Sequence, residues 1–364
     1  MAEIKAEICR IESVSKHPNA DALDLVQVKG WNCVVKSGSC PQGSLCLYIP
    51  IDACIPKEVE EVVFKGVKVS LTNGRIKAIR IRQIVSQGLV VDPSLLNLHS
   101  KAEGYDATAE LGITKYEPPE PAFQGFNGGG KNKVRVENPY FKKYTSIEHL
   151  KNHWKVFEPA DEVYVTEKLH GTNWRAGYVV RLPVTNLEKL WLPVAQRFFE
   201  SFNWQFMVGS HNVQLRPEEN NLYCNVAKHC GLKHLLGKGI VLYGEVIGPN
   251  IQKNYSYGLT ADCYPRLVLF DVQIAGVYQS FETVQKFANQ LKIDCVPVLA
   301  SGQIQSLKLD ELVQGPSAYS PLQKVKEGIV IRPMHSEQTT RIGRKILKYI
   351  NPEYLMLKDN TDYH

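Results

Sequence analysis

A strand-like run passes into a glycine turn in the segment Glu162-Val163-Tyr164-Val165-Thr166-Glu167-Lys168-Leu169-His170-Gly171-Thr172-Asn173. Residues 162–167 are rich in β-branched and aromatic side chains, which favours a strand, and the glycine that follows suits a tight turn. We therefore expect sheet pairing to hold the backbone of Lys168 while its amine projects into a cleft. The alternative is an ordinary surface lysine before a turn, and this segment alone does not choose between the two.

A catalytic role for Lys168 would make a demand on its surroundings. A free lysine has a pKa near about 10.4, so it is protonated at neutral pH and cannot act as a nucleophile. Burial, neighbouring cations and a metal-bound phosphate all favour the neutral amine. Gly171 would let a nucleotide approach the backbone, and Thr172 and Asn173 offer hydroxyl and amide groups to ribose or phosphate. The rest of the chain must supply the remaining groups.

Four later segments share one arrangement, in which a short apolar run is bounded by groups that bind nucleotides or metals. They are residues 240–246 with Glu245, 267–272 with Phe270, 326–332 with Glu327, and 344–349 with Lys345 and Lys348. Two carboxylates suit hydrated magnesium, an aromatic ring can stack on a base, and lysines neutralise phosphate. Each segment is a weak signal alone, but the repetition favours the catalytic interpretation of Lys168.

The first 100 or so residues have the pattern of a small antiparallel barrel, with short alternating runs broken by Gly, Pro and Asn. Asn73-Gly74 predicts a hairpin turn, and the strand expected after it carries four cations, Arg75, Lys77, Arg80 and Arg82. We expect one face of the barrel to be basic and exposed.

Two short segments of this region resemble tRNA-binding OB-fold domains. They are Lys16-His17-Pro18-Asn19-Ala20-Asp21-Ala22-Leu23 and Ser86-Gln87-Gly88-Leu89. The resemblance implies the OB fold. Binding of RNA and stabilisation of a barrel loop both remain open as roles for the first motif.

Residues 113–145 differ in character from the sequence on either side. They contain Pro118-Pro119-Glu120-Pro121 and Gly128-Gly129-Gly130 and few apolar side chains, which indicates a linker. Basic and aromatic residues follow in alternation: Lys131, Lys133, Arg135, Tyr140, Phe141, Lys142, Lys143, Tyr144, Lys151, Trp154 and Lys155. This stretch is either a solvated linker or a groove that holds a nucleic-acid backbone.

The sequence thus predicts three parts. These are an OB-fold nucleic-acid-binding module at 1–112, a Pro/Gly-rich and basic linker at 113–145, and a catalytic domain at 146–364. From about residue 160 strands alternate with helical stretches, so we expect an α+β domain. Apolar spacing predicts one helix over 186–202, interrupted by Pro193, and another over 281–291.

Composition narrows the class of protein. With 364 residues, 44% of them hydrophobic and 22% charged, the chain can fold as two globular domains and is not disordered or fibrous. A net charge of +6 suits a phosphate-rich partner, and nine scattered cysteines suit reduced thiols. No run approaches the roughly 18 apolar residues of a membrane span. We expect an intracellular monomer, in the cytoplasm or an organellar matrix, that is neither secreted nor bound to a membrane.

The five segments, in their order along the chain, resemble motifs I, III, IIIa, IV and V of the covalent nucleotidyltransferases, the superfamily of ATP-dependent ligases and mRNA capping enzymes. With Glu167 before the lysine and His-Gly-Thr-Asn after it, motif I is most similar to that of nick-sealing RNA ligases. Residues 244–258 and 111–117, with the OB-like N-terminal region, resemble the subgroup with an OB module ahead of the catalytic domain. This implies an α+β nucleotidyltransferase (ATP-grasp-like ligase) fold, preceded by an all-β OB-fold barrel.

The resemblance implies an RNA repair reaction in three steps, with ATP as substrate and Mg²⁺ or Mn²⁺ as cofactor. Lys168 attacks the α-phosphorus of ATP to form lysyl-AMP, AMP passes to an RNA 5′-phosphate, and a 3′-OH displaces AMP to join the ends. The RNA would be a nicked or broken duplex. By the family pattern, Lys168 is the catalytic residue, and Glu245 and Glu327 bind the metal. The nucleotide is bound by Glu167, Leu169, Asn173, Arg175, Glu245, Phe270, Lys345 and Lys348. Phe270 would stack on adenine, with core packing as its alternative role.

The chain departs from the family pattern in three places. His170 stands where most ligases and capping enzymes have an aspartate, as it does in nick-sealing RNA ligases. Ser210-His211-Asn212 occurs where an arginine often contacts phosphate, so His211, Arg216 or another residue would have to take that role. Motif V spaces its two lysines three residues apart rather than two, and of the pair we favour Lys348 because it directly follows the apolar run.

Two other classes of function compete with an RNA ligase. One is a noncatalytic RNA-binding protein on a ligase scaffold, which does not explain why Lys168, Glu245, Glu327 and Lys348 occur together. The other is a DNA ligase or capping enzyme, which would need a C-terminal OB domain, whereas only 16 residues follow Lys348. Without that domain we hypothesise that Lys142 and Lys143 orient pyrophosphate.

Overall fold

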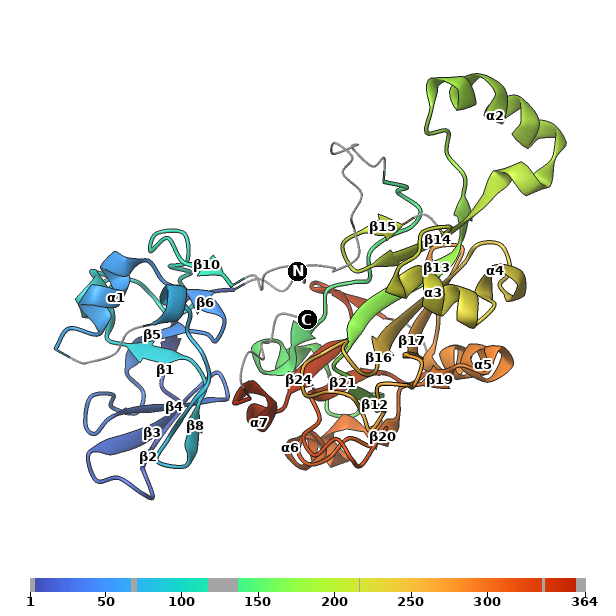
Figure 1. Cartoon of the computed structure of the whole chain (residues 1–364). Coiled ribbons are helices and arrows are strands. Elements are labelled where there is room, and N and C mark those ends of the chain that lie inside the picture. Colours follow the sequence, from blue (N-terminus) through green and yellow to red (C-terminus); the bar gives the residue numbers. More distant parts are fainter. Residues whose placement is uncertain (1–3, 67–70, 117–136, 216, 336–337, 358–364) are drawn as a thin grey trace. The chain divides into compact units, whose positions relative to one another are not determined.

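The computed structural model describes residues 4–66, 71–116, 137–215, 217–335 and 338–357 (Figure 1). It divides into two compact units. Unit 1 comprises residues 1–121, 147–154 and 349–364, and unit 2 comprises 122–146 and 155–348. Each unit therefore contains segments that are far apart in the sequence. The three domain boundaries expected from the sequence remain a prediction.

Unit 1 is built on short antiparallel strands. The strands are β1 (Glu7–Arg10), β2 (Ser13–Lys16), β3 (Leu23–Val28), β4 (Trp31–Lys36), β5 (Leu45–Ile49), β6 (Ala53–Cys54), β7 (Ile79–Ile81), β8 (Ile84–Ser86), β9 (Leu89–Val91), β10 (Thr114–Lys115) and β11 (Glu148–His149). Strand pairing gives the orders β1-β5-β9 and β2-β3-β4 and the pairs β7-β8 and β10-β6. Two α-helices belong to this unit, α1 (Lys57–Val63) and α7 (Pro352–Leu355).

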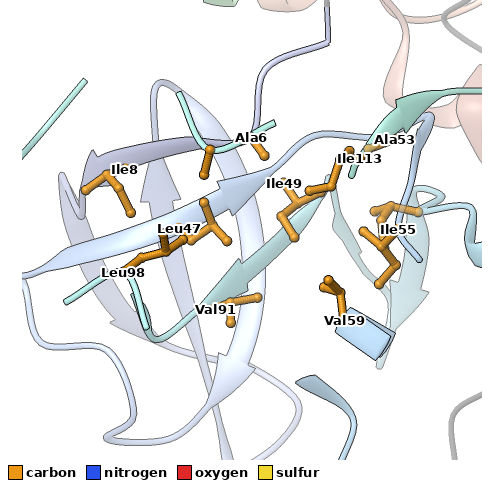
Figure 2. Close-up of a cluster of buried hydrophobic side chains, with 12 residues drawn as sticks. Ala6, Ile8, Leu47, Ile49, Ala53, Ile55, Val59, Val91, Leu98 and Ile113 are labelled. Carbon is orange, nitrogen blue, oxygen red and sulfur yellow. The ribbon is translucent and has the colours of Figure 1, made fainter. Parts of the chain in front are cut away.

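Alternation of side chains along these strands creates the core of unit 1. In β3 every second residue is buried, the pattern of a strand with one face in the core. Figure 2 shows one cluster, in which Ile8, Leu47, Ile49 and Leu98 are fully buried. An ion pair is also buried: Arg75 Nη2 lies 2.6 Å from Asp52 Oδ1, with both side chains 5% exposed. The strand expected to be basic thus uses its first arginine inside the barrel.

The tight turn expected at Asn73-Gly74 is present. Asn73 (φ 54°) and Gly74 (φ 67°) have positive φ, and Arg75 N donates to the Thr72 carbonyl (3.2 Å). Residues 67–70, which would supply the first strand of that hairpin, lie outside the described residues, so the hairpin stays a prediction. A hairpin that the sequence did not indicate joins β7 to β8, and its two turn residues are Arg82 (φ 46°) and Gln83 (φ 75°). Two-residue hairpin turns with positive φ favour Asn-Gly, because other side chains are strained there by about 1–2 kcal/mol per residue.

Contacts from the His-Pro-Asn segment hold the strained turn in place. Asn19 N donates to His17 Nδ1 (3.1 Å), so His17 Nε2 carries the proton and donates to the Ile81 carbonyl (3.1 Å). Asn19 Nδ2 donates to the Arg82 carbonyl (2.9 Å). Of the two roles considered for this motif, the structure shows stabilisation of a barrel loop.

The described part of unit 2 contains two large, mostly antiparallel sheets and one pair of short strands. The smaller has the order β24-β21-β12-β20, formed by β12 (Glu162–Lys168), β20 (Val298–Gln303), β21 (Gly328–Pro333) and β24 (Leu347–Ile350). The chain passes from unit 2 into unit 1 within β24. The larger has the order β15-β14-β13-β16-β17-β18 and comprises β13 (Thr172–Val180), β14 (Trp204–Ser210), β15 (Gln214–Leu215), β16 (Ile240–Ile247), β17 (Arg266–Ile274) and β18 (Val277–Tyr278). A further strand, β19 (Asp294–Cys295), pairs parallel with β17, and β22 (Thr339–Thr340) pairs with β23 (Gly343–Arg344).

Helices of unit 2 are α2 (Asn186–Phe198), α3 (Leu222–His229), α4 (Leu232–Leu235), α5 (Phe281–Leu291) and α6 (Leu309–Leu312). The helix expected over 281–291 is confirmed as α5, which begins at the cap Ser280 and buries Phe281, Val284 and Ala288. The helix expected over 186–202 is shorter, because it ends at Phe198, and Pro193 lies inside it without breaking it. In the part of the chain that the structure describes, no helix meets the length and hydropathy of a membrane span.

The strained β7–β8 turn yields a stability prediction. Replacing Arg82→Asn together with Gln83→Gly should raise the free energy of unfolding by about 1 kcal/mol, because this pair adopts positive φ with little strain. Urea denaturation followed by circular dichroism measures the change. Lower stability for this double variant would show that the turn residues contribute contacts that outweigh the backbone strain.

Candidate active site

Strand pairing brings Lys168 to Glu327. β12 lies between β20 and β21, and in its register with β21 Lys168 stands opposite Gly328, the residue after Glu327. Lys168 Nζ lies 2.5 Å from Glu327 Oε1, with the lysine side chain 14% exposed and the glutamate 1%. Residues Val165 to Glu167 of this central strand are all buried, so both faces of β12 pack inside the unit. Motifs 159 residues apart thus form one buried ion pair.

The turn at Gly171 brings a second carboxylate close. Gly171 N donates to Glu245 Oε1 (3.0 Å), and Asn173 pairs with Glu245 in the register of β13 with β16. A Cβ at position 171 would lie 2.3 Å from the Val246 carbonyl oxygen and 2.9 Å from Glu245 Cγ, so only glycine fits. Burial, with repulsion from Glu327, raises the pKa of Glu245 to about 8 against the attraction of Lys168. Lys168, Glu327 and Glu245 therefore act electrostatically as one group.

His170 lies in the same turn as a buried, neutral imidazole. Its Nδ1 is 3.8 Å from Glu327 Oε2, and its ring packs edge-on against Tyr255 with centroids 4.7 Å apart. Burial, and secondarily the charge of Lys168, lowers the pKa of His170 to about 3. A neutral imidazole adds no charge to the site, in contrast to the aspartate found in most of the superfamily.

Residues 252–257 support this turn from outside, a role that sequence reasoning missed. Gln252 Nε2 donates to the Gly171 carbonyl (2.7 Å), and Tyr257 Oη accepts from His170 N (2.7 Å). Tyr255 Oη donates to the Val325 carbonyl (3.0 Å), which ties the segment to the chain just before Glu327. In the sequence, residues 252–257 are polar and aromatic and contribute to the resemblance to one subgroup. That resemblance indicated no structural role for them.

The two carboxylate oxygens of Glu167 differ in their hydrogen bonding. Its Oε2 accepts from Ala318 N (2.7 Å) and Tyr319 N (3.1 Å), whereas its buried Oε1 has no hydrogen-bond partner among the described residues. Burial raises the pKa of this carboxyl despite those hydrogen bonds. Leu169, on the other side of the lysine, is 4% exposed and forms an apolar wall.

Four residues of the site carry buried polar atoms for which the described residues offer no partner. They are Glu167 Oε1, Glu327 Oε2, Asn173 Oδ1 and Arg175 Nε and Nη1. Leaving such an atom unsatisfied costs about 1–3 kcal/mol, so native proteins rarely do so without a ligand. The arrangement offers acceptors and a cation to a polar, anionic molecule.

The carboxylates also suit a hydrated divalent cation. In the described part of the chain no set of three or more His, Cys, Asp or Glu side chains could enclose a metal alone. Magnesium commonly takes one or two carboxylates and fills its remaining positions with water and phosphate oxygens. Glu327, with Oε2 open, and Glu245 fit that pattern.

Phe270 lies at an irregularity of the larger sheet. The register of β16 with β17 shifts there, because Tyr243 pairs with Asp271 and Gly244 with Leu269, which leaves Phe270 as the extra residue of a β-bulge. Bulges often redirect a side chain beside an active site. The Phe270 ring is half-buried and meets the edge of Tyr144 with centroids 4.8 Å apart. The geometry leaves both stacking on a base and core packing open to it.

The two lysines of motif V have different surroundings. Lys345 Nζ lies 2.6 Å from Asp161 Oδ2 and donates to Gln338 Oε1 (3.1 Å), at a cavity of about 190 Å³ also lined by Phe157 and His335. Lys348 is 1% exposed on β24, the strand next to β21. Lys345 lies in a bend ahead of β24, in which Ile346 N donates to the Arg344 carbonyl (2.8 Å), so different elements hold the two lysines.

Residues 137–146, expected to be linker, pack on the larger sheet of unit 2. Phe141 lies under the Arg175 guanidinium (4.7 Å to the ring centroid), and Tyr144 Oη donates to Asp271 Oδ2 (2.7 Å). Between these anchors Lys142 and Lys143 are exposed, and Lys143 Nζ donates to Asn212 Oδ1 (3.4 Å).

One candidate for the motif Ia phosphate contact, His211, directly precedes Asn212, the residue that accepts from Lys143 Nζ. Burial, then Arg175 and Lys143, lowers the pKa of His211 to about 4, so His211 is neutral at pH 7. The other candidate, Arg216, falls outside the described residues, as do Lys131, Lys133 and Arg135.

Comparisons with known proteins agree with this geometry. The RNA ligase family model matches residues 161–350, and an OB-fold domain model matches residues 5–93. No curated protein matches the chain.

Solved structures also resemble the chain over nearly its full length. A structure of the Naegleria gruberi RNA ligase with PPi is 25% identical, has a TM-score of 0.71, and is matched over 96% of this chain and 97% of that one. A lysine-to-alanine variant of that ligase, with ATP and Mn, is 25% identical over the same shares, with a TM-score of 0.72. The fold is thus an OB-fold module followed by an α+β nucleotidyltransferase domain, and because the family model spans more than half of the sequence, the chain belongs to the RNA ligase family.

Proposed function

We propose that this chain is an ATP-dependent RNA ligase that joins RNA 3′-OH and 5′-phosphate ends through lysyl-AMP and RNA-adenylate. The observation that carries the proposal is the buried ion pair of Lys168 with Glu327, set among polar atoms without partners. Family membership supports the activity, and the ATP with Mn and the AMP with Mn in structures of the Naegleria gruberi ligase support the nucleotide and the metal. We extend the proposal to nicked or broken RNA duplexes and to a role in RNA repair.

In the first step Lys168 Nζ bonds to the α-phosphorus of ATP, the bond between that phosphorus and the bridging oxygen breaks, and pyrophosphate leaves. Glu167 Oε1 would accept a hydrogen bond from the adenine amino group, since Oε2 is held by two backbone amides. Asn173 Oδ1 and the Arg175 guanidinium offer open contacts to ribose and phosphate. Glu327 and Glu245 would hold a divalent cation, which would supply positive charge that neutralises phosphate and favours the neutral amine.

Two further steps return the lysine to its starting state. The phosphorus–nitrogen bond of lysyl-AMP breaks as a 5′-phosphate oxygen of RNA bonds to the AMP phosphorus. A 3′-OH then bonds to the 5′-phosphorus, loses its proton and releases AMP. Both transfers depend on alignment and charge neutralisation more than on acid–base chemistry. Phe270 is proposed to stack on adenine and Lys348 to hold the α-phosphate, whereas Lys345 is proposed to stabilise the fold through Asp161.

Covalent labelling tests the function. With α-labelled ATP and Mg²⁺ or Mn²⁺, the wild type should acquire label and Lys168→Ala should acquire none, because the nucleophile is missing. The control Lys189→Ala removes an exposed lysine of α2 and should label normally. Absence of label on the wild type would favour the noncatalytic RNA-binding alternative, and label from GTP in place of ATP would favour a capping enzyme.

The two lysines of motif V should differ in their effect on activity. Lys348→Ala should slow lysyl-AMP formation by about 100-fold or more, the usual cost of removing one charge-stabilising group. Lys345→Ala should change the rate by only a few fold while lowering the unfolding midpoint, because it breaks the ion pair with Asp161. Rates are compared at a temperature where all variants are folded. A similar rate loss in both would contradict the separate roles.

Lys142 and Lys143 are proposed to orient the pyrophosphate group of ATP. Their anchors, Phe141 and Tyr144, hold them beside Arg175. Replacing both lysines with alanine should slow lysyl-AMP formation and spare the sealing of pre-adenylated RNA, since pyrophosphate takes part in the first step alone. A matched control, Lys189→Ala with Lys233→Ala, removes the same charge from exposed positions on α2 and α4. Equal loss of adenylation and sealing would rule out a role confined to pyrophosphate.

A further inference from the structure

The β7–β8 hairpin of unit 1 combines backbone strain with exposed positive charge. Arg82 and Gln83 both have positive φ, and the side chains of His17 and Asn19 hold the two carbonyls at this turn. Strain kept in place by dedicated contacts is commonly found where a protein presents side chains for function.

The side chains on this hairpin and the strand entering it suit a polyanion. Lys77, Arg80, Arg82 and Gln83 are exposed, and so is 51% of Ile79. In the part of the chain that the structure describes, no carboxylate forms an ion pair with Lys77, Arg80 or Arg82. Arg75, from the same stretch, is instead buried against Asp52. One arginine of residues 75–82 is therefore in the core, and the other three cations are exposed and can contact a ligand.

The hairpin is firmly attached to the barrel. Val34 N donates to Ser86 Oγ (3.0 Å), and Gln87 N donates to the Asn32 carbonyl (2.8 Å). These two hydrogen bonds attach the end of β8 to β4. The buried ring of His17 holds the tip from the other side. A rigid, basic projection of this kind loses little conformational entropy when it contacts a ligand.

We propose that the β7–β8 hairpin contacts the phosphate backbone of the RNA substrate, through Arg80 and Arg82, with Lys77 nearby. The inference rests on the proposed ligase function, which makes RNA the polyanion that this chain must hold. His17 and Asn19 act as positioning residues that keep Arg82 at the tip. Phosphate contacts of this type place an enzyme on a duplex without reading its sequence.

Binding of the full-length protein to a nicked RNA duplex tests the proposal. The duplex lacks the 5′-phosphate and EDTA is present, so no sealing occurs. The double variant Arg80→Gln, Arg82→Gln should weaken binding roughly 10- to 40-fold at about 0.1 M salt. It should also flatten the slope of log K against log salt by about 1.5, because each phosphate contact contributes roughly 0.7 to 0.9 to that slope. The control Lys57→Gln with Lys65→Gln removes the same charge on and after α1, away from β8 in Figure 1, and should change affinity less than about 3-fold.

A second variant removes misfolding as an explanation. Arg82→Asn with Gln83→Gly, which should stabilise the barrel, is expected to bind RNA more weakly than the wild type. Unchanged affinity and salt slope in Arg80→Gln with Arg82→Gln, or an equal loss in the Lys57 and Lys65 control, would overturn the proposal. Loss of binding to phosphatidylserine vesicles with unchanged RNA affinity would assign the hairpin to a membrane surface instead.

Lysyl-AMP formation separates this proposal from the function on which it rests. The step needs no RNA, so the hairpin variants should label with ATP at the wild-type rate. Normal labelling with unchanged RNA affinity would defeat the hairpin proposal alone. Failure of the wild type to label would defeat the ligase function whatever the binding result.

Discussion

The pairing of β12 with β21 is the constraint on which the site depends. Antiparallel register sets Lys168 opposite Gly328, so Glu327 meets the lysine amine at 2.5 Å. A slip of one residue would turn every side chain of the strand to the opposite face and separate the pair. Burial specifies that register strongly, because Val163 and Val165 lie on one face of β12 and are fully buried. The position of the nucleophile is therefore a product of sheet packing.

Around this pair the protein maintains an environment that is costly without a ligand. Burial, with repulsion from Glu327, raises the pKa of Glu245 to about 8 against the attraction of Lys168, and burial keeps His170 neutral. Several buried polar atoms of the site have no partner among the described residues. Such a site contributes little to folding, and its groups are best satisfied by nucleotide phosphate, ribose and a hydrated cation. Stability and function thus compete at the same residues.

The barrel shows the same competition on its surface. An Asn-Gly turn between β7 and β8 would carry less strain than Arg82-Gln83, yet the chain uses the side chains of His17 and Asn19 to hold the strained form. Sequence reasoning did not predict this hairpin, because it relied on local turn preference, which Arg82-Gln83 lacks. Tertiary contacts outweighed that preference, since two hydrogen bonds from another loop can offset the strain of a short turn.

The sequence by itself determined the family and the helix at 281–291 and proposed Lys168 as the nucleophile, because these depend on local residue order and on periodicity. It identified Glu167, Glu245, Glu327 and Lys348 as separate residues on separate strands. Only the tertiary structure decided which atoms meet. It paired Lys345 with Asp161, left Glu167 Oε1 open, and placed Tyr255 and Tyr257 against the motif I turn. Those outcomes depend on contacts between residues far apart in the chain, which strand register and side-chain packing establish and local sequence does not encode.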